Sequence, residues 1–143
     1  MRDLTIFYTD DDEDDLSIFT DAVESLSKEI NLQTYSGGDK LLNAVNHPPP
    51  KPSVIFLDLN MPGKNGFDVL GELKGSKENR DIPVVIFSTS SEPGIIAKCL
   101  DLGANYFITK PVQMKDIIKS IEHSLNINWK EFVPDSKTFV HKP

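Results

Sequence analysis

The chain has 143 residues, of which 38% are hydrophobic and 26% are charged, and its formal net charge is −7 at pH 7. This length and apolar content suit one domain with a core of its own. The excess of negative charge argues against proteins that bind a nucleic-acid backbone or an anionic membrane, because both need a basic surface.

The start of the chain, "MRDLTIFYTDD", has an apolar run too short for a signal peptide, and no apolar run approaches the roughly 20 residues that span a bilayer. Cys99 is the single cysteine, so an intrachain disulfide cannot form, and we expect it to lie in the core. We therefore expect a soluble protein of the cytoplasm.

Five short apolar segments, rich in β-branched and aromatic residues, predict strands. In chain order they are residues 4–8, 30–35, 53–57, 83–87 and 105–108. The segments between them carry apolar residues at helical spacing, in five stripes: Leu16, Phe19, Val23 and Leu26; Leu41, Leu42 and Val45; Phe67, Leu70 and Leu73; Ile95, Ile96, Cys99 and Leu100; and Met114, Ile117, Ile118, Ile121 and Leu125. This alternation predicts repeated βαβ units, and hence a doubly wound α/β domain with a parallel sheet and helices on both faces.

The helical pattern ends near residue 125, so we expect one domain over residues 1–125 and a tail over residues 126–143 without an output domain. The tail spaces Trp129, Phe132 and Phe139 among polar residues. Two interpretations remain open: the aromatic side chains pack onto the domain, or the tail docks a partner.

The polar residues that follow the strands are the candidates for a site, because ligands of an open parallel sheet bind outside the carboxyl ends of its strands. Asp10 and Asp11 follow the first strand, and Asp58 follows the third. Ser88 follows the fourth strand and Lys110 the fifth. Carboxylates, a hydroxyl group and an ammonium group are thus predicted to meet at one edge.

Three clustered carboxylates need a cation, since each like-charge pair costs about 4 kcal/mol at ~4 Å and an effective dielectric near ~20. Oxygen ligands without thiolate or imidazole suit Mg²⁺, which commonly also takes a phosphoryl oxygen. Asp58 is therefore a candidate nucleophile that forms an aspartyl phosphate. Lys110 would then place a positive charge on the phosphoryl oxygens, and Ser88 a hydrogen bond.

The acidic run "TDDDEDD" divides into two parts. Residues 12–15 are expected to begin the first helix, where negative charge meets the helix N-terminus. The alternating acids from Asp10 also resemble a Ca²⁺-binding loop. Asp15 stands where that loop needs Gly and Asp21 where it needs Glu, which argues against an EF-hand.

Together these motifs resemble the receiver domains of two-component response regulators, in particular stand-alone receivers similar to the chemotaxis response regulator. The resemblance covers about residues 4–125. It rests on "DD" after the first strand, "FLDLNMPGKNGFDVL" around the end of the third, "FSTS" after the fourth and "YFITKPV" after the fifth. It implies a flavodoxin-like fold with five helices and a five-stranded parallel sheet in the strand order 2-1-3-4-5.

The resemblance also implies roles for the site residues. Asp58 would accept a phosphoryl group from a phosphohistidine on a sensor histidine kinase or a phosphotransfer protein. Asp11, Asp58 and the backbone carbonyl of Asn60 would bind Mg²⁺ directly, and Asp10 would act mostly through water. Ser88 and Lys110 would contact the phosphoryl group.

Further implications of the resemblance concern conformation. The peptide between Lys110 and Pro111 would be cis and would orient the lysine. A switch would link Ser88 to an aromatic residue three positions before the lysine, here Phe107, which lacks the hydroxyl of the common tyrosine, so we expect the switch to work through packing. Tyr106 should point to the other side of the sheet, because side chains alternate along a strand. The implied output surface is formed by the fourth helix, the fifth strand and the fifth helix.

We interpret the chain as a single-domain response regulator that signals by Mg²⁺-dependent, reversible phosphorylation and protein–protein contact, and not as an enzyme. One alternative is a receiver fold that binds partners without phosphorylation. Another is a small Mg²⁺-dependent phosphatase, but such enzymes carry a cap and a second acid two residues after the nucleophile, where Asn60 stands here. The histidines lack metal-ligand spacing, and we expect all of them on the surface: His47, His123 and His141.

Overall fold

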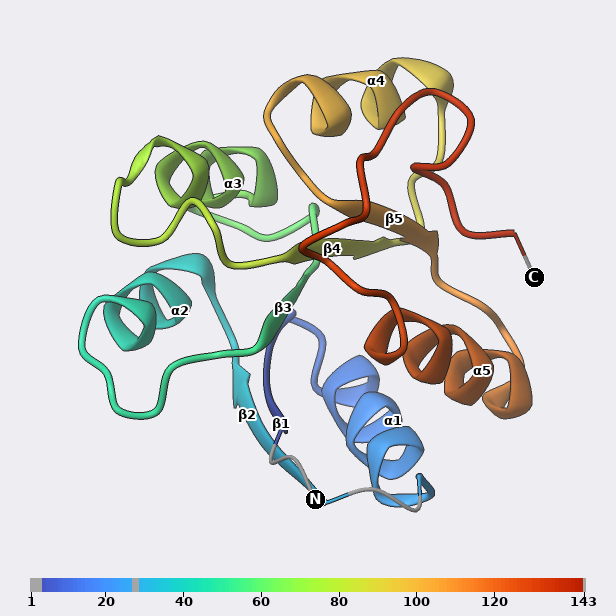
Figure 1. The fold of residues 1–143 in the computed structure, drawn as a ribbon. Helices are drawn as coiled ribbons and strands as arrows, with labels where there is room; N and C mark the ends of the chain where they lie inside the picture. Colours follow the sequence, from blue (N-terminus) through green and yellow to red (C-terminus); the bar gives the residue numbers. More distant parts are fainter. Residues whose placement is uncertain (1–3, 27–28, 143) are drawn as a thin grey trace.

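A computed structural model describes residues 4–26 and 29–142 of the chain. Five parallel strands form one sheet in the order β2-β1-β3-β4-β5, as predicted (Figure 1). The strands are β1 (Leu4–Thr9), β2 (Ile30–Tyr35), β3 (Val54–Leu57), β4 (Val84–Ser88) and β5 (Tyr106–Thr109). Each strand lies within one residue of its predicted bounds at either end.

Each strand is followed by a helix, and the helices cover both faces of the sheet. They are α1 (Glu13–Glu24), α2 (Gly38–Val45), α3 (Gly66–Gly75), α4 (Pro93–Asp101) and α5 (Met114–Leu125). Figure 1 shows α1 and α5 on one face and α2, α3 and α4 on the other. The predicted doubly wound architecture is therefore confirmed.

Two hydrophobic clusters fill the spaces between the sheet and its helices. Along β1, Phe7 belongs to the cluster under α2, α3 and α4, whereas its neighbours Ile6 and Tyr8 belong to the cluster under α1 and α5. This alternation follows from the twofold period of a strand and explains why the strands are apolar throughout. Cys99 is buried in α4 as predicted, whereas Met114, at the start of α5, is 38% exposed.

Helix α1 begins within the acidic run. The Asp12 side chain is its N-cap, where Oδ1 accepts hydrogen bonds from the backbone N–H groups of Asp14 at 2.8 Å and Asp15 at 3.3 Å. Acidic residues occupy the first turn, where the helix dipole favours negative charge. The prediction that residues 12–15 begin the helix is confirmed.

Residues 126–142, which we call the tail, fold back onto the domain. Figure 1 shows the tail, in red, leaving α5, crossing β5 towards α4 and turning back. Phe139 is 1% exposed, and Trp129 and Phe132 make edge-on ring contacts with Tyr106 at centroid distances of 6.1 Å and 5.9 Å. Of the two interpretations of the tail, the structure shows the packed one.

One prediction about the histidines is wrong. His47 and His123 are exposed, but His141 is only partly exposed, and its Nδ1 lies 3.0 Å from the Tyr106 hydroxyl. Burial and the nearby His123 lower the pKa of His141 below its ordinary value. His141 therefore belongs to the packing between the tail and the domain.

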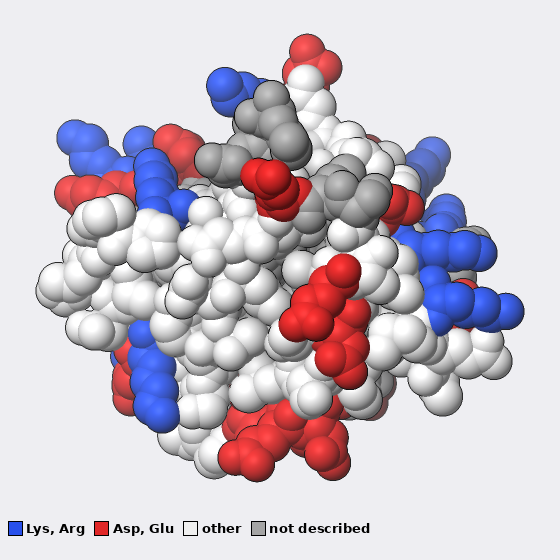
Figure 2. Space-filling model, turned by 90° about the horizontal axis from the view of Figure 1, so that it is seen from below, with Lys and Arg blue, Asp and Glu red and all other residues white. Residues whose placement is uncertain are grey.

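The surface reflects the acidic composition. On the face seen in Figure 2, acidic side chains gather at the centre and lower edge, and basic ones lie towards the two sides. This face offers no broad basic surface among its described residues. In the part of the chain that the structure describes, no helix is long and apolar enough to cross a membrane.

Candidate functional site

The carboxyl ends of the strands bring the predicted residues to one edge of the sheet. Backbone hydrogen bonds continue past the strands: the N–H of Asp58 donates to Thr9 O at 3.1 Å, and that of Lys110 donates to Ser88 O at 2.9 Å. Asp10 N–H likewise donates to the backbone oxygen of residue 35 at 3.1 Å. Because these bonds fix the first residues after the strands, the side chains at this edge are held by the sheet itself.

Asp10, Asp11 and Asp58 form a compact carboxylate cluster. One oxygen from each residue can be chosen so that all three lie within 4.8 Å of one another. Asp10 and Asp58 are buried, whereas Asp11 is exposed. Hard oxygen donors at this spacing, open to solvent through Asp11, fit a small divalent cation.

Lys110 lies across the cluster. Its Nζ donates to Asp10 Oδ2 at 2.7 Å and to Asp15 Oδ2 at 2.9 Å, and lies 3.6 Å from Asp58 Oδ1. Burial by itself lowers the pKa of the Lys110 ammonium, but these hydrogen bonds and the charges of Asp58 and Asp10 raise it above its ordinary value. Lys110 is therefore a permanent positive charge beside the carboxylates.

The pKa of the Asp58 carboxyl group is shifted from its ordinary value. Burial raises its pKa to about 7, the charge of Asp10 adds to the shift, and the charge of Lys110 opposes it. A backbone hydrogen bond from Asn60 also opposes the shift, and Asp11 adds to it. A cation bound between these carboxylates would therefore stabilise the charged form of Asp58.

Ser88 ends β4, Asn60 lies two residues after Asp58, and both form hydrogen bonds with Ser90. Ser88 is fully buried, and its Oγ accepts a hydrogen bond from the Ser90 N–H at 3.2 Å. Asn60 is exposed, and its Nδ2 donates to Ser90 Oγ at 3.1 Å. The two loops after β3 and β4 are thus joined next to Asp58.

Two residues of the site were missed by the sequence analysis. Tyr8 donates from its hydroxyl to Asp10 Oδ2 at 2.5 Å; burial, followed by the charge of Asp10, raises the pKa of Tyr8 above its ordinary value. Asp15 pairs with Lys110 besides lying in the first turn of α1. Asp15 could have been predicted, because it lies five residues after Asp10 in the first turn of a helix that starts at the site. Tyr8 could not, because its sequence context is that of an ordinary core residue of a strand.

Gly66 is a third residue that sequence reasoning missed. A Cβ at this position would lie 2.5 Å from the backbone oxygen of Asp58 and 2.6 Å from the Cα of Leu59. These distances are shorter than those of real Cβ contacts. The atoms in the way belong to the backbone, which cannot rotate away as a flexible side chain could. The glycine therefore allows α3 to begin directly against the loop that carries Asp58.

Gly66→Ala is expected to lower the free energy of unfolding by about 1 to 3 kcal/mol, because the new methyl group must displace the backbone of Asp58 and Leu59. Urea denaturation measures the change. Gly71→Ala is the matched control: it lies inside the same helix with no atom within 4 Å of the added Cβ, and should stabilise by about 0.5 to 1 kcal/mol. Equal effects of the two changes would contradict this account of Gly66.

The predicted cis peptide before Pro111 is wrong. The cis bonds among the described residues precede Pro49 and Pro50, and the Lys110–Pro111 bond is trans. The contacts of Lys110 Nζ with Asp10 and Asp15 hold the side chain in place instead.

Phe107 and Tyr106 point to opposite faces of the sheet, as predicted. Phe107 is fully buried in the cluster under α2, α3 and α4, and Tyr106 belongs to the cluster under α1 and α5. Phe107 therefore shares its face of the sheet with Ile86, its partner in β4. Ser88 lies two residues after Ile86 in β4, so its side chain points to the same face of the sheet.

Comparison with known proteins gives a consistent result. The family described as the response regulator receiver domain matches residues 6–122. Among curated proteins, the two-component response regulator ARR9 of Arabidopsis thaliana is 41% identical over 86 residues, which is 60% of this chain and 37% of ARR9. The chain thus spans well under two thirds of the length of this relative.

Solved structures agree with the sequence comparison. The Mn²⁺-bound form of response regulator Rcp1, a protein of Synechocystis, is 26% identical with a TM-score of 0.76, over 92% of this chain and 97% of that one. The phosphorylated cyanobacterial phytochrome response regulator RcpA is 25% identical with a TM-score of 0.79, over 93% and 98% of the two chains. The fold, the arrangement of the acidic cluster and these matches lead to one conclusion: the chain belongs to the family of response regulator receiver domains.

Proposed function

We propose that this receiver domain is a switch controlled by Mg²⁺-dependent, reversible phosphorylation of Asp58. The observation that carries the proposal is the cluster of Asp10, Asp11 and Asp58 with the Lys110 ammonium group against it. Receiver domains act mainly as signalling modules, and related proteins have been solved with Mn²⁺ bound, as in Rcp1, and phosphorylated, as in RcpA.

The phosphoryl donor would be a phosphohistidine on a sensor histidine kinase or a phosphotransfer protein. An oxygen of the Asp58 carboxylate supplies the electron pair for the new P–O bond, while the P–N bond to the histidine breaks and its electrons return to the ring. Deprotonation of Asp58 is a requirement of this step, and Lys110 favours it through its charge.

The cation would be held by Asp11, Asp58 and the backbone carbonyl of Asn60, with Asp10 acting mostly through water. Bound there, Mg²⁺ supplies positive charge to the carboxylates and to the transferred group. Lys110 would place its positive charge on the phosphoryl oxygens, since its Nζ already lies 3.6 Å from Asp58 Oδ1. Ser88 would donate a hydrogen bond to another phosphoryl oxygen, because its Oγ only accepts in the contact with the Ser90 N–H and its own hydroxyl hydrogen is left to donate.

The signal would leave through contact with a downstream protein, on the surface formed by α4, β5 and α5. Phe107 in β5 would respond to Ser88 through packing alone, because its ring has no hydroxyl to bond. The tail lies over this same surface, so a partner that binds there must either displace the tail or contact it.

Incubation with Mg²⁺ and acetyl phosphate tests the proposal by intact mass. Wild type is expected to gain one phosphoryl group, and Asp58→Asn to gain none. Asp68→Asn, the same change at an exposed position of α3, is the matched control and should behave as wild type.

Other results would point elsewhere. No gain of mass by wild type, with Mg²⁺ binding intact, would favour a receiver fold that works as an interaction module without phosphorylation. Rapid turnover of several phosphoesters would favour a phosphatase. A gain that persists in Asp58→Asn would place the phosphoryl group on another residue.

A further inference from the structure

The tail is fastened to β5 at one residue. The Phe107 N–H donates to Phe139 O at 3.0 Å, and the His141 N–H donates to Phe107 O at 2.8 Å, so that Val140 forms a parallel bridge with Phe107. Because β5 is at the edge of the sheet, these backbone groups would otherwise face outward unpaired. The tail thus completes the edge of the sheet beside Phe107.

The side chain of Phe107 is held by the same segment. The rings of Phe107 and Phe139 lie 6.1 Å apart between centroids, and both side chains are buried. Phe139 joins the same hydrophobic cluster as Phe107 and Ile86. Any movement of the Phe107 ring therefore changes the packing of Phe139.

Phe107 also borders the site. In the parallel register Ile86 pairs with Phe107 and Ser88 pairs with Thr109, which places Ser88 diagonally across from Phe107. Since Ile86 and Phe107 share one face, and side chains two apart along a strand point the same way, Ser88 lies on that face as well. Space vacated by the Ser88 side chain would open towards Phe107.

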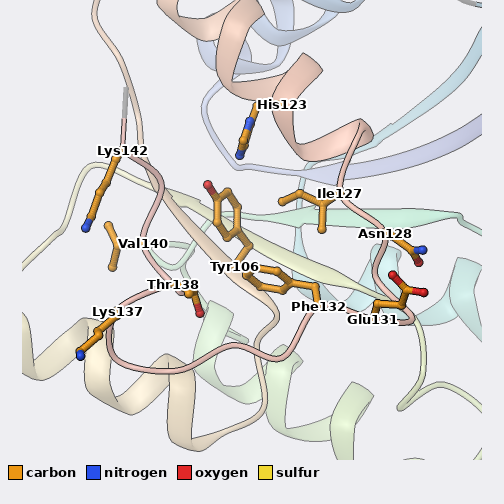
Figure 3. Close-up of a pocket in the computed structure, with 10 residues that line it drawn as sticks. All are labelled: Tyr106, His123, Ile127, Asn128, Glu131, Phe132, Lys137, Thr138, Val140 and Lys142. Atoms are coloured by element: carbon orange, nitrogen blue, oxygen red, sulfur yellow. The ribbon is translucent and has the colours of Figure 1, made fainter.

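The rest of the tail is held more loosely. A pocket of about 620 Å³ lies between it and the domain, lined in part by Tyr106, Ile127, Phe132 and Val140. Figure 3 shows Tyr106 at the centre of this pocket, between residues from the end of α5 and residues of the tail. Val133 is 78% exposed. Among the described residues of the tail, Phe139 is the one buried side chain, so release of the tail depends mainly on whether this ring leaves the core.

We propose that the tail is a releasable cover of the α4–β5–α5 surface and that phosphorylation of Asp58 weakens its docking through Ser88 and Phe107. This inference rests on the proposed function. The phosphoryl group draws the Ser88 hydroxyl towards itself, the Phe107 ring moves into the space behind it, and Phe139 loses its ring partner. By linkage, weaker docking of the tail favours the phosphorylated form to the same degree.

Trp129 reports on the docking, because it is the single tryptophan of the chain and lies in the tail against Tyr106 and Phe132. Two measurements follow the tail: quenching of Trp129 fluorescence by acrylamide, and the rate of tryptic cleavage after Lys137. Both are made on the full chain with Mg²⁺, before and after acetyl phosphate, in samples whose phosphorylated fraction is read from intact mass. In wild type, treatment with acetyl phosphate is expected to increase both the quenching of Trp129 and the rate of cleavage after Lys137. In Asp58→Asn, the same treatment should change neither.

Two variants loosen the tail in different ways. Phe139→Ala removes the buried ring, and His141→Pro removes the N–H that donates to Phe107 O. Each is expected to raise cleavage after Lys137 in the unphosphorylated protein by about tenfold or more, and to increase the fraction phosphorylated at a given acetyl phosphate concentration. Val133→Ala, an exposed change in the same tail, is the matched control and should alter neither.

The outcomes separate the two proposals. A gain of mass without any change in Trp129 quenching or in cleavage would overturn the coupling and leave the proposed function intact. Equal phosphorylation of wild type, Phe139→Ala and His141→Pro would overturn it as well. Absence of any gain of mass would overturn the proposed function and, with it, the coupling.

Discussion

Asp58→Asn is expected to make the metal-free protein more stable than wild type at pH 8, by on the order of 3 kcal/mol. Burial and the neighbouring Asp10 raise the pKa of Asp58 from 3.8 to about 7 in the folded protein. Between these two pKa values the folded state binds more protons than the unfolded state. The free energy of unfolding of wild type therefore falls as the pH rises from about 4 to 7, whereas asparagine does not titrate.

Urea denaturation in EDTA at pH 5, 6, 7 and 8 measures this difference, which should grow with pH and level off above pH 7. Asp68→Asn, an acid-to-amide change at an exposed position, should stay within about 0.5 kcal/mol of wild type throughout. Saturating Mg²⁺ should narrow the gap at pH 8, because a cation between the carboxylates stabilises wild type more than the variant. A difference in stability that does not change with pH would show that the ionisation of Asp58 is not its cause.

Lys110→Met is expected to destabilise the metal-free protein by about 3 kcal/mol at neutral pH. The lysine Nζ contacts Asp10 and Asp15 and lies near Asp58, and Asp10 is 1% exposed. Removal of the ammonium group leaves carboxylates that are buried together without a counter-charge. Protonation of Asp58, whose pKa is raised by burial, and the partial exposure of Asp15 limit the loss.

Lys64→Met provides the matched control for this prediction. Lys64 also contacts two carboxylates, Glu72 and Asp39, but at the surface, where such pairs contribute about 0 to 1 kcal/mol. Urea denaturation in EDTA compares the two variants, and Mg²⁺ should restore part of the stability of Lys110→Met only. If Lys110→Met were no less stable than Lys64→Met, the ammonium group would not be what balances the cluster.

Much of the fold could be predicted because it depends on local patterns. The apolar runs around Phe7, Ile55 and Ile86 are short and unbroken, as strands buried on both faces must be, and the stripes between them have helical spacing. The predicted bounds differ by single residues where a strand begins or ends in a loop.

Much of the site could also be predicted, for a topological reason. In a parallel sheet every strand ends at the same edge, so Asp10, Asp58 and Lys110 had to meet once the strands were identified. The carboxylate and ammonium groups that they bring to this edge then follow from residue type. The trans peptide before Pro111 and the partly buried His141 were predicted wrongly, because neither a peptide isomer nor the path of an irregular tail is set by local sequence.

The sequence by itself thus determined the strands, the order in which polar residues follow them, and the collection of carboxylates and one ammonium group at a single edge. Only the tertiary structure decided that Asp15 reaches Lys110 across 95 residues, that Tyr8 donates to Asp10, and that Gly66 leaves room for the Asp58 loop. It also decided that the tail covers β5. These features depend on the directions of side chains and on contacts between distant segments, which no local pattern records.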